Sequence, residues 1–140
     1  MKILLAVDGS PYTQKMLAYL TSHQEMLGTD HQYTVITVQP VLPPRVRSVL
    51  GKTSVEQYYS EESEKILVPV TEFLGGRGVQ AETLSRVGPI ADTIIDVAKT
   101  GKFDLIMMGT HGHGALGRLV MGSVSTQVLA GCDIPVLLIR

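Results

Sequence analysis

The segment from Phe103 to Gly114 reads FDLIMMGTHGHG and combines an apolar run with a glycine-rich one. The apolar half is typical of a strand that is buried on both faces of a parallel sheet. The glycine-rich half begins at Gly109, and five of the 14 glycines of the chain fall between Gly109 and Gly122. In open parallel sheets, ligands bind at the carboxyl ends of the strands. The segment therefore predicts an α/β sheet that carries a functional loop after one strand.

Four further apolar runs have the length of strands and lie at residues 3–7, 33–38, 79–87 and 135–139. Between these runs, apolar residues recur with helical spacing, which predicts helices at residues 11–27, 54–74, 90–99 and 123–130. This alternation predicts an α/β fold whose parallel sheet is covered on both faces. We expect Pro69 to kink or split the second helix. We expect residues 39–53, which contain three prolines, to form a surface loop.

Three turn signals refine the expected helices. Ser10 is placed to cap the first helix, with Pro11 at its first position and Gly28 at its end. Ser54 and Gln57 have the spacing of a capping box at the start of the second helix.

Composition excludes several classes of function. The 140 residues fit one domain, and 12 basic against 13 acidic residues give a net charge of -1. A nearly neutral chain without tryptophan has no charged or stacking surface for nucleic acid, and no apolar stretch approaches the ~20 residues of a membrane span. Cys132 is the single cysteine, which excludes an internal disulfide and favours the reducing cytoplasm.

The glycine loop favours phosphate binding. Glycines bring the backbone close to a ligand, and successive N–H groups form an anion-binding concavity. Gly122 and Ser123 stand where the fourth helix begins, so that free N–H groups and the positive end of the helix dipole face the loop. Ser123 and Ser125 add hydroxyl groups. The alternative is that the glycines serve only to reverse the chain.

Several other motifs and side chains could indicate different chemistry. Gly51-Lys52-Thr53 resembles the end of a phosphate-binding P-loop, but the first glycine of that motif is replaced by Val46. His111 and His113 lack further ligands for zinc, and we expect His113 to be solvated. Asp8 is expected either to cap the first helix or to reach a nucleotide-bound Mg²⁺. A catalytic triad of Ser10, Asp8 and His111 is disfavoured because no nucleophile elbow is present.

The whole chain resembles the universal stress protein family. The resemblance is carried by AVDGS at residues 6–10, GP at 88–89, DLIMMGTHG at 104–112, GSVS at 122–125 and PVLLI at 135–139. It implies one domain over residues 1–140 with an open five-stranded parallel sheet of order 3-2-1-4-5. This is the Rossmann-like arrangement of the adenine nucleotide alpha hydrolase-like proteins. The resemblance also implies a homodimer that pairs the last strand, from Pro135 to Ile139.

The resemblance further implies a site for an adenine nucleotide: ATP, ADP or AMP, with Mg²⁺ or Mn²⁺ accompanying it. The adenine and ribose would be framed by Ala6, Val7, Asp8 and Val38. The ribose and first phosphate would be held by Met108, Gly109, His111 and Gly112. The distal phosphates would be taken by Gly122, Ser123, Val124 and Ser125.

The function predicted in this way is a nucleotide-dependent binding module of the stress response, with a protein partner that the sequence does not identify. A slow ATPase using the same site is one alternative, for which Arg118 is the only nearby cation in the loop. A dimeric scaffold that works independently of nucleotide is another. No catalytic residue and no direct protein ligand to a metal are assigned.

Overall fold

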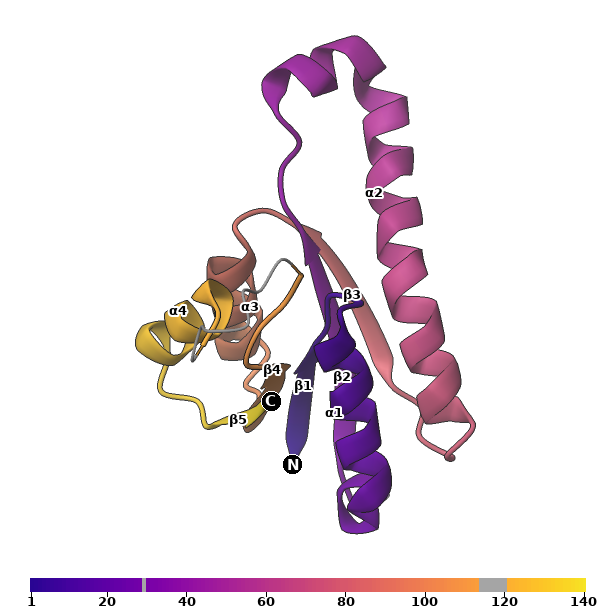
Figure 1. The fold of residues 1–140 in the computed structure, drawn as a ribbon, viewed down its shortest axis with the longest axis vertical. Helices are drawn as coiled ribbons and strands as arrows, with labels where there is room; N and C mark the ends of the chain where they lie inside the picture. The colour runs from indigo at the N-terminus through magenta and orange to yellow at the C-terminus, as the bar shows by residue number, and fades with distance from the viewer. Residues whose placement is uncertain (29, 114–120) are drawn as a thin grey trace.

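The sheet positions everything else in the molecule. The computed structural model describes residues 1–28, 30–113 and 121–140, and these form one five-stranded parallel sheet of order β3-β2-β1-β4-β5 (Figure 1). The strands are β1 (Lys2–Ala6), β2 (Gln32–Gln39), β3 (Glu82–Val87), β4 (Leu105–Gly109) and β5 (Val136–Ile139). The helices are α1 (Pro11–Ser22), α2 (Pro44–Gly75), α3 (Ile90–Thr100) and α4 (Ser123–Gly131), with a short 3₁₀ helix η1 (Gln24–Leu27) after α1. The predicted α/β class and strand order are confirmed.

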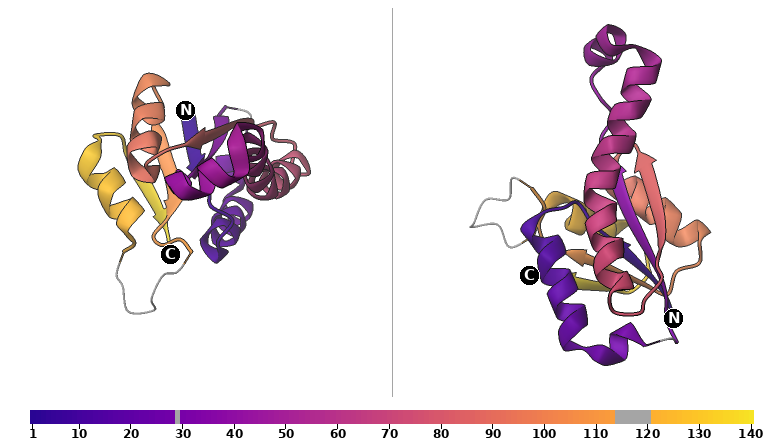
Figure 2. Two further views of the ribbon diagram at one scale, coloured as in Figure 1. Left: turned by 90° about the horizontal axis from the view of Figure 1, so that it is seen from above. Right: turned by 90° about the vertical axis from the view of Figure 1, so that its right-hand side faces the viewer.

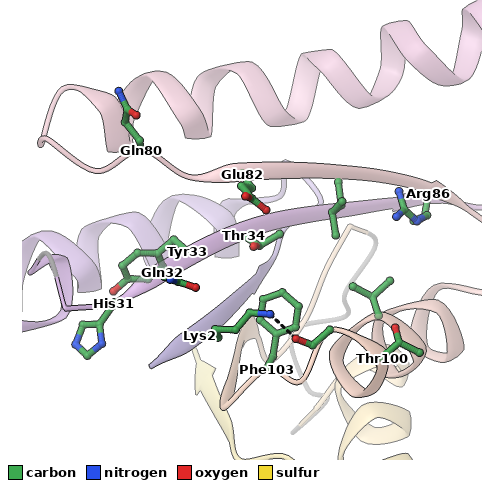
Figure 3. A pocket seen from close by; sticks show the side chains of 13 residues that line it. Lys2, His31, Gln32, Tyr33, Thr34, Gln80, Glu82, Arg86, Thr100 and Phe103 are labelled. Atoms are coloured by element: carbon green, nitrogen blue, oxygen red, sulfur yellow. Dashed lines mark hydrogen bonds between the residues drawn. The ribbon is translucent and has the colours of Figure 1, made fainter.

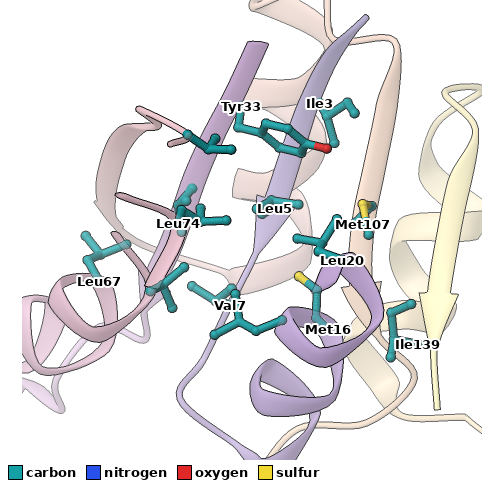
Figure 4. Close-up of a cluster of buried hydrophobic side chains, with 14 residues drawn as sticks. Ile3, Leu5, Val7, Met16, Leu20, Tyr33, Leu67, Leu74, Met107 and Ile139 are labelled. Atoms are coloured by element: carbon teal, nitrogen blue, oxygen red, sulfur yellow. The ribbon is translucent and has the colours of Figure 1, made fainter. Parts of the chain in front are cut away.

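Helices cover both faces of the sheet, and the central strands are therefore apolar on both sides. One face packs against α1 and α2 through a cluster that includes Leu5, Leu20 and Leu74 (Figure 4). The other face packs against α3 and α4 through a cluster that includes Leu4 and Ile106. Figure 2 shows the two helical layers on opposite sides of the sheet.

The winding direction reverses between β1 and β4. The chain moves outward from β1 through β2 to β3, and then returns to place β4 on the other side of β1. The register pairs Ala6 with Met108, so the carboxyl ends of β1 and β4 lie side by side. Because the connections leaving these two ends go to opposite faces, a crevice opens between them, which is where open α/β sheets bind ligands.

The loop expected at residues 39–53 is confined to residues 40–43. β2 continues to Gln39, α2 already begins at Pro44, and Gly51 bends it with a φ of 79°. Proline fits the first turn of a helix, so Pro44 marks a start rather than a loop. Ser54 and Gln57 consequently lie inside α2 and form no capping box.

Pro69 does not split α2, whose described break in helical geometry lies at Gly51. Pro69 and Lys65, the residue whose carbonyl group loses its helical partner, are both exposed. Water can therefore satisfy that carbonyl group, which lowers the cost of the proline.

Two element boundaries also differ from expectation. The first helix ends at Ser22 rather than near Gly28, because His23 leaves helical geometry and the chain continues as η1. The third strand begins at Glu82 rather than at residue 79. Val79 is instead buried in the cluster beneath α2.

None of the helices formed by residues 1–28, 30–113 and 121–140 has the length and apolar character needed to cross a membrane.

Replacement of Leu5 by alanine tests the packing of the central strand. The Leu5 side chain is fully buried, and its truncation is expected to lower the free energy of unfolding by about 2–5 kcal/mol. Leu129→Ala is the matched control because that side chain is 44% exposed, and its effect should stay below about 1 kcal/mol. Urea unfolding measures both, and equal losses would contradict the packing described.

Candidate functional site

A cavity of about 650 Å³ lies at the carboxyl ends of β1, β2 and β4. All twelve residues that the sequence singled out for the site line this cavity. They are Ala6, Val7, Asp8, Val38, Met108, Gly109, His111, Gly112, Gly122, Ser123, Val124 and Ser125. Segments more than 80 residues apart in the chain are thus brought together at the point where the winding direction reverses.

The turn after β1 is held by a local hydrogen-bond network. The carboxylate oxygen Oδ1 of Asp8 accepts from the backbone N–H of Ser10 at 2.9 Å. The fully buried Ser10 caps α1 by accepting from the N–H of Tyr12, as expected. Gly9 makes the turn with a φ of 75°, a conformation that favours glycine. Asp8 therefore orders the start of α1, and this role leaves its other oxygen, Oδ2, directed toward Gly112.

Close approach explains the glycines of the site that the structure describes. A Cβ atom at Gly112 would lie 2.5 Å from Oδ2 of Asp8, and one at Gly109 would lie 2.5 Å from Cβ of Tyr12. A Cβ atom at Gly122 would lie 3.1 Å from the carbonyl oxygen of Thr110. A side chain at Gly109 or Gly112 would displace a neighbouring side chain, and one at Gly122 would press on the backbone of Thr110.

The two ends of the glycine loop are tied at Thr110. Its carbonyl oxygen accepts from the N–H of Gly122 at 2.7 Å and from the hydroxyl group of Ser125 at 2.7 Å. Ser125 is 2% exposed, and its hydroxyl group also lies 3.1 Å from the carbonyl oxygen of Gly122. The Ser125 side chain thus fixes the loop ends as well as lining the cavity. Gly114, Gly117 and Arg118, which the sequence analysis placed in this loop, lie outside the described residues.

The start of α4 faces the cavity. Ser123 and Val124 form its first turn and line the cavity, and Gly122 occupies the N-cap position in an extended conformation. The first amides of a helix have no intrahelical acceptor and carry the positive end of the helix dipole. This end of the cavity is therefore suited to an anion.

The cavity also has an apolar lining. It includes side chains from β2, α3 and β4, namely Ile36, Val38, Ile90, Ile94 and Met108. An apolar slot next to an anion-binding helix end accommodates a ligand with a flat apolar part and a charged part.

Both histidines of the loop have partners in the protein. His113 is exposed, as expected, and its Nε2 atom also lies 2.8 Å from the carbonyl oxygen of Asp8. The His111 ring lies 5.3 Å from that of Tyr12, and its Nδ1 atom is 2.9 Å from the hydroxyl oxygen of Thr110. Among residues 1–28, 30–113 and 121–140, no cluster of three or more metal-binding side chains occurs.

The helices α2 and α1 also contribute to the site, at positions that the sequence does not predict. Glu62 and Ile66 line the cavity from the long helix, and Tyr12 and Thr13 line it from α1. No motif marks these residues, because their position depends on how the helices pack on the sheet. The lining side chains of the described part of the chain include the carboxylates of Asp8 and Glu62 but no lysine or arginine.

A second cavity of about 650 Å³ lies near the amino ends of β1, β2 and β3 (Figure 3). There α3 presents its carboxyl end, and the ammonium group of Lys2 donates to the carbonyl oxygen of Gly101. A helix carboxyl end repels anions, and Lys2 is already paired. Of these two cavities, as lined by the described residues, the first alone combines a helix amino end with the glycine loop.

Comparison with known proteins assigns the family. A family model described as the universal stress protein family matches residues 1–140. The chain belongs to that family. A universal stress protein of Thermus aquaticus is 34% identical over 139 residues, covering 99% of this chain and 97% of that protein. The universal stress protein YxiE of Bacillus subtilis is 29% identical over 150 residues, with 99% and 98% covered.

Solved structures of this family share the fold. The hypothetical protein MJ0577 of Methanocaldococcus jannaschii superposes with a TM-score of 0.82 at 22% identity, with 99% of this chain and 94% of that chain covered. A family protein of Arabidopsis thaliana with AMP bound has a TM-score of 0.65 at 19% identity, with 99% and 90% covered. A universal stress protein of Archaeoglobus fulgidus in complex with dAMP has a TM-score of 0.67 at 21% identity, with 100% and 98% covered.

Replacement of Ser125 by alanine tests the tie between the loop ends in this universal stress protein. The change removes a buried hydroxyl donor and leaves the Thr110 carbonyl oxygen with one partner fewer, so the free energy of unfolding should fall by about 1–3 kcal/mol. Ser123→Ala is the matched control, because Ser123 is exposed in the same helical turn, and it should change stability by less than about 1 kcal/mol. Chemical denaturation distinguishes the two variants. Equal stability of Ser125→Ala and the parent protein would refute the tie.

Proposed function

We propose that the chain binds ATP in the cavity at the carboxyl ends of β1 and β4 and acts as a nucleotide-dependent regulatory module of the stress response. The observation that carries the proposal is the convergence of all twelve expected residues on this one cavity. The AMP and dAMP complexes of structurally similar family members support an adenine nucleotide as its ligand.

The chemistry of the cavity orients the proposed ligand. The adenine ring lies in the apolar part, between the strand end at Ala6 and Val38 and the side chain of Met108. Val7, Asp8 and His111 then flank the ribose. The first phosphate lies against the backbone of Gly109 and Gly112. This order follows because apolar side chains favour the base, whereas the amino end of a helix favours phosphate.

The distal phosphates meet the start of α4 in this orientation. The backbone amides of Gly122, Ser123 and Val124 act as donors, together with the Ser123 hydroxyl group, while Ser125 serves as a positioning residue through Thr110. An arrangement built from backbone donors binds phosphate without a lysine side chain.

A divalent cation belongs to the proposal. The described lining residues carry the carboxylates of Asp8 and Glu62 and no basic side chain except the histidines. A triphosphate beside two carboxylates is repelled unless its charge is partly neutralised, and Mg²⁺ or Mn²⁺ bound to the phosphates does this. Oδ2 of Asp8, which faces the glycine loop, is the nearest candidate to reach such an ion, directly or through water.

Binding rather than turnover is the proposed role. Phosphoryl transfer requires a positioned nucleophile and charge stabilisation in the transition state. The described lining residues supply no arginine or lysine for that purpose. We further propose a cytoplasmic homodimer that pairs β5, because β5 is an edge strand whose unpaired backbone groups are available to a second copy.

Replacement of Gly112 by alanine tests the site. The added methyl group would lie 2.5 Å from Oδ2 of Asp8 and must displace the loop or the carboxylate, so ATP affinity should fall about ten-fold or more. Gly75→Ala is the matched control, because nothing lies within 4 Å of a Cβ atom at that exposed position. Isothermal titration with ATP measures both variants. Unchanged affinity in Gly112→Ala, or equal losses in both, would contradict the proposed site.

Removal of divalent cations tests the role of the metal. Chelation with EDTA should weaken ATP binding about ten-fold or more, because the triphosphate then meets the two carboxylates without neutralisation. AMP carries fewer charges, so its affinity should fall much less on chelation. Titration of both nucleotides with and without Mg²⁺ gives the comparison. Equal metal dependence for ATP and AMP would refute this reading of the cavity.

A further inference from the structure

The amino-terminal part of α2 and the segment leading to it project beyond the sheet as an arm (Figure 1). We define the arm as residues 41–64. Four of the five buried residues of α2 belong to its last 13 residues, and Val55 is the one buried side chain before Ser63. The right-hand view of Figure 2 shows the same projection from a second direction. The arm therefore contributes little to the core of the domain.

Exposed apolar side chains gather on this arm. In the described part of the chain, nine large apolar residues are exposed, and five of these belong to the arm. They are Val41, Val46, Val49, Leu50 and Tyr58. Val49 is 85% exposed, more than any other of the nine. Scattered exposed apolar residues need no explanation, but a concentration of them on a projecting element marks an interaction surface.

Charges divide along the same arm. We call residues 44–52 the tip and residues 53–64 the stem. The tip carries the exposed cations Arg45, Arg47 and Lys52. The stem carries Glu56, Glu61, Glu62 and Glu64. Tip and stem are therefore of opposite sign. Lys65, the cation that directly follows the arm, is paired with Glu62 at 2.8 Å.

We propose that the arm is a docking surface for the arm of a second copy of this chain. In a two-fold pair whose stems run in opposite directions, the basic tip of each copy lies against the acidic stem of the other. Both contacts are then attractive, as a self-complementary interface requires. The exposed apolar residues between the charges are buried by the same contact. A parallel pairing would oppose like charges at both ends.

The structure of the arm suits this role. The N–H of Leu42 donates to the hydroxyl group of Tyr59 at 2.9 Å. This hydrogen bond ties the segment that precedes α2 to the stem. Gly51, with a φ of 79°, turns the tip back onto the helix without strain. A surface that is ordered before association loses less conformational entropy when it binds.

A second copy fits better than a lipid surface. The tip alone, with three cations and exposed valines, would suit an anionic membrane. The acidic stem follows within about two turns of helix and would be repelled by the same membrane. Only a partner with the opposite order of charges satisfies tip and stem together, and an antiparallel copy of the arm has that order.

This contact is separate from the proposed nucleotide site and from pairing through β5. Arg45, Arg47, Glu61 and Glu64 do not line the cavity, whereas Glu62 does and is left unchanged in the test. β5 and β3 form opposite edges of the sheet, and the arm follows β2 on the β3 side. A molecule that used both the arm contact and β5 pairing would link dimers into larger assemblies.

Charge exchange between two variants tests the proposal. One variant reverses the tip with Arg45→Glu and Arg47→Glu, and the other reverses the stem with Glu61→Lys and Glu64→Lys. A matched double reversal outside the arm, Arg77→Glu with Lys102→Glu, is the control, since both residues are exposed. Each protein also carries Cys132→Ser and Ser54→Cys, so that a donor or acceptor dye marks an exposed position between tip and stem.

Energy transfer between dye-labelled copies reports arm contact, and sedimentation velocity reports assembly size. We expect transfer in the parent and the control, and an association about ten-fold or more weaker in the tip variant alone and in the stem variant alone. An equimolar mixture of the two variants should restore transfer, because each reversed tip then meets a reversed stem. Circular dichroism and unaltered ATP titration confirm that the variants are folded.

Three outcomes would overturn the proposal. They are no energy transfer in the parent, equal transfer in the parent and both arm variants, and no recovery in the mixture. Binding of the parent to phosphatidylserine vesicles that is lost in the tip variant, without any transfer in solution, would assign the arm to a membrane instead. Because ATP titration is measured on the same proteins, failure of arm pairing and failure of nucleotide binding are distinguishable.

Discussion

The pairing of β1 with β4 is the constraint on which the site depends. These strands are adjacent in the sheet although about 100 residues separate them in the chain, and their register places Ala6 beside Met108. The segments that leave them diverge, with the Asp8 turn leading to α1 and the glycine loop leading to α4. The cavity exists because these two segments cannot close over the strand ends. Any change that separates β1 from β4 would therefore disrupt the Asp8 turn and the glycine loop, which line the cavity from its two sides.

The glycines of the loop have a structural role that also suits the proposed ligand. At Gly109 and Gly112 the absent side chain lets the loop pass against Tyr12 and Asp8. The same close passage leaves backbone amides at the cavity wall, where a phosphate would need them. Chain reversal and anion binding were alternatives at the level of sequence. In the folded chain one backbone path reverses the chain and is also compatible with the proposed anion binding, with Ser125 holding its ends through Thr110.

Local signals predicted most of the fold. Apolar runs marked the strands because central parallel strands are buried on both faces, and Ser10 with Pro11 marked the start of α1. The order of strands and the site residues came from family resemblance, since pairing between distant segments leaves no local pattern. The glycine spacing, GxxG followed by GS, was visible because close approach forbids other residues there.

The errors have equally specific causes. Prolines at residues 40–44 indicated a loop, but Pro44 begins a helix, and Gly51 supplies the bend that a loop would have provided. Glu62 and Ile66 enter the cavity only because α2 crosses the end of β2, which depends on packing rather than on a motif. The projecting arm was also missed, since its apolar and charged residues have meaning only once the helix is seen to extend beyond the sheet.

A crystal structure of the protein with ATP and Mg²⁺ tests the central claim most directly. The account predicts one nucleotide in the cavity between the carboxyl ends of β1 and β4. Its adenine should lie near Val38 and Met108, and its distal phosphates at the start of α4. A nucleotide bound instead in the cavity beside Lys2 and Phe103, or no nucleotide at saturating concentration, would contradict it.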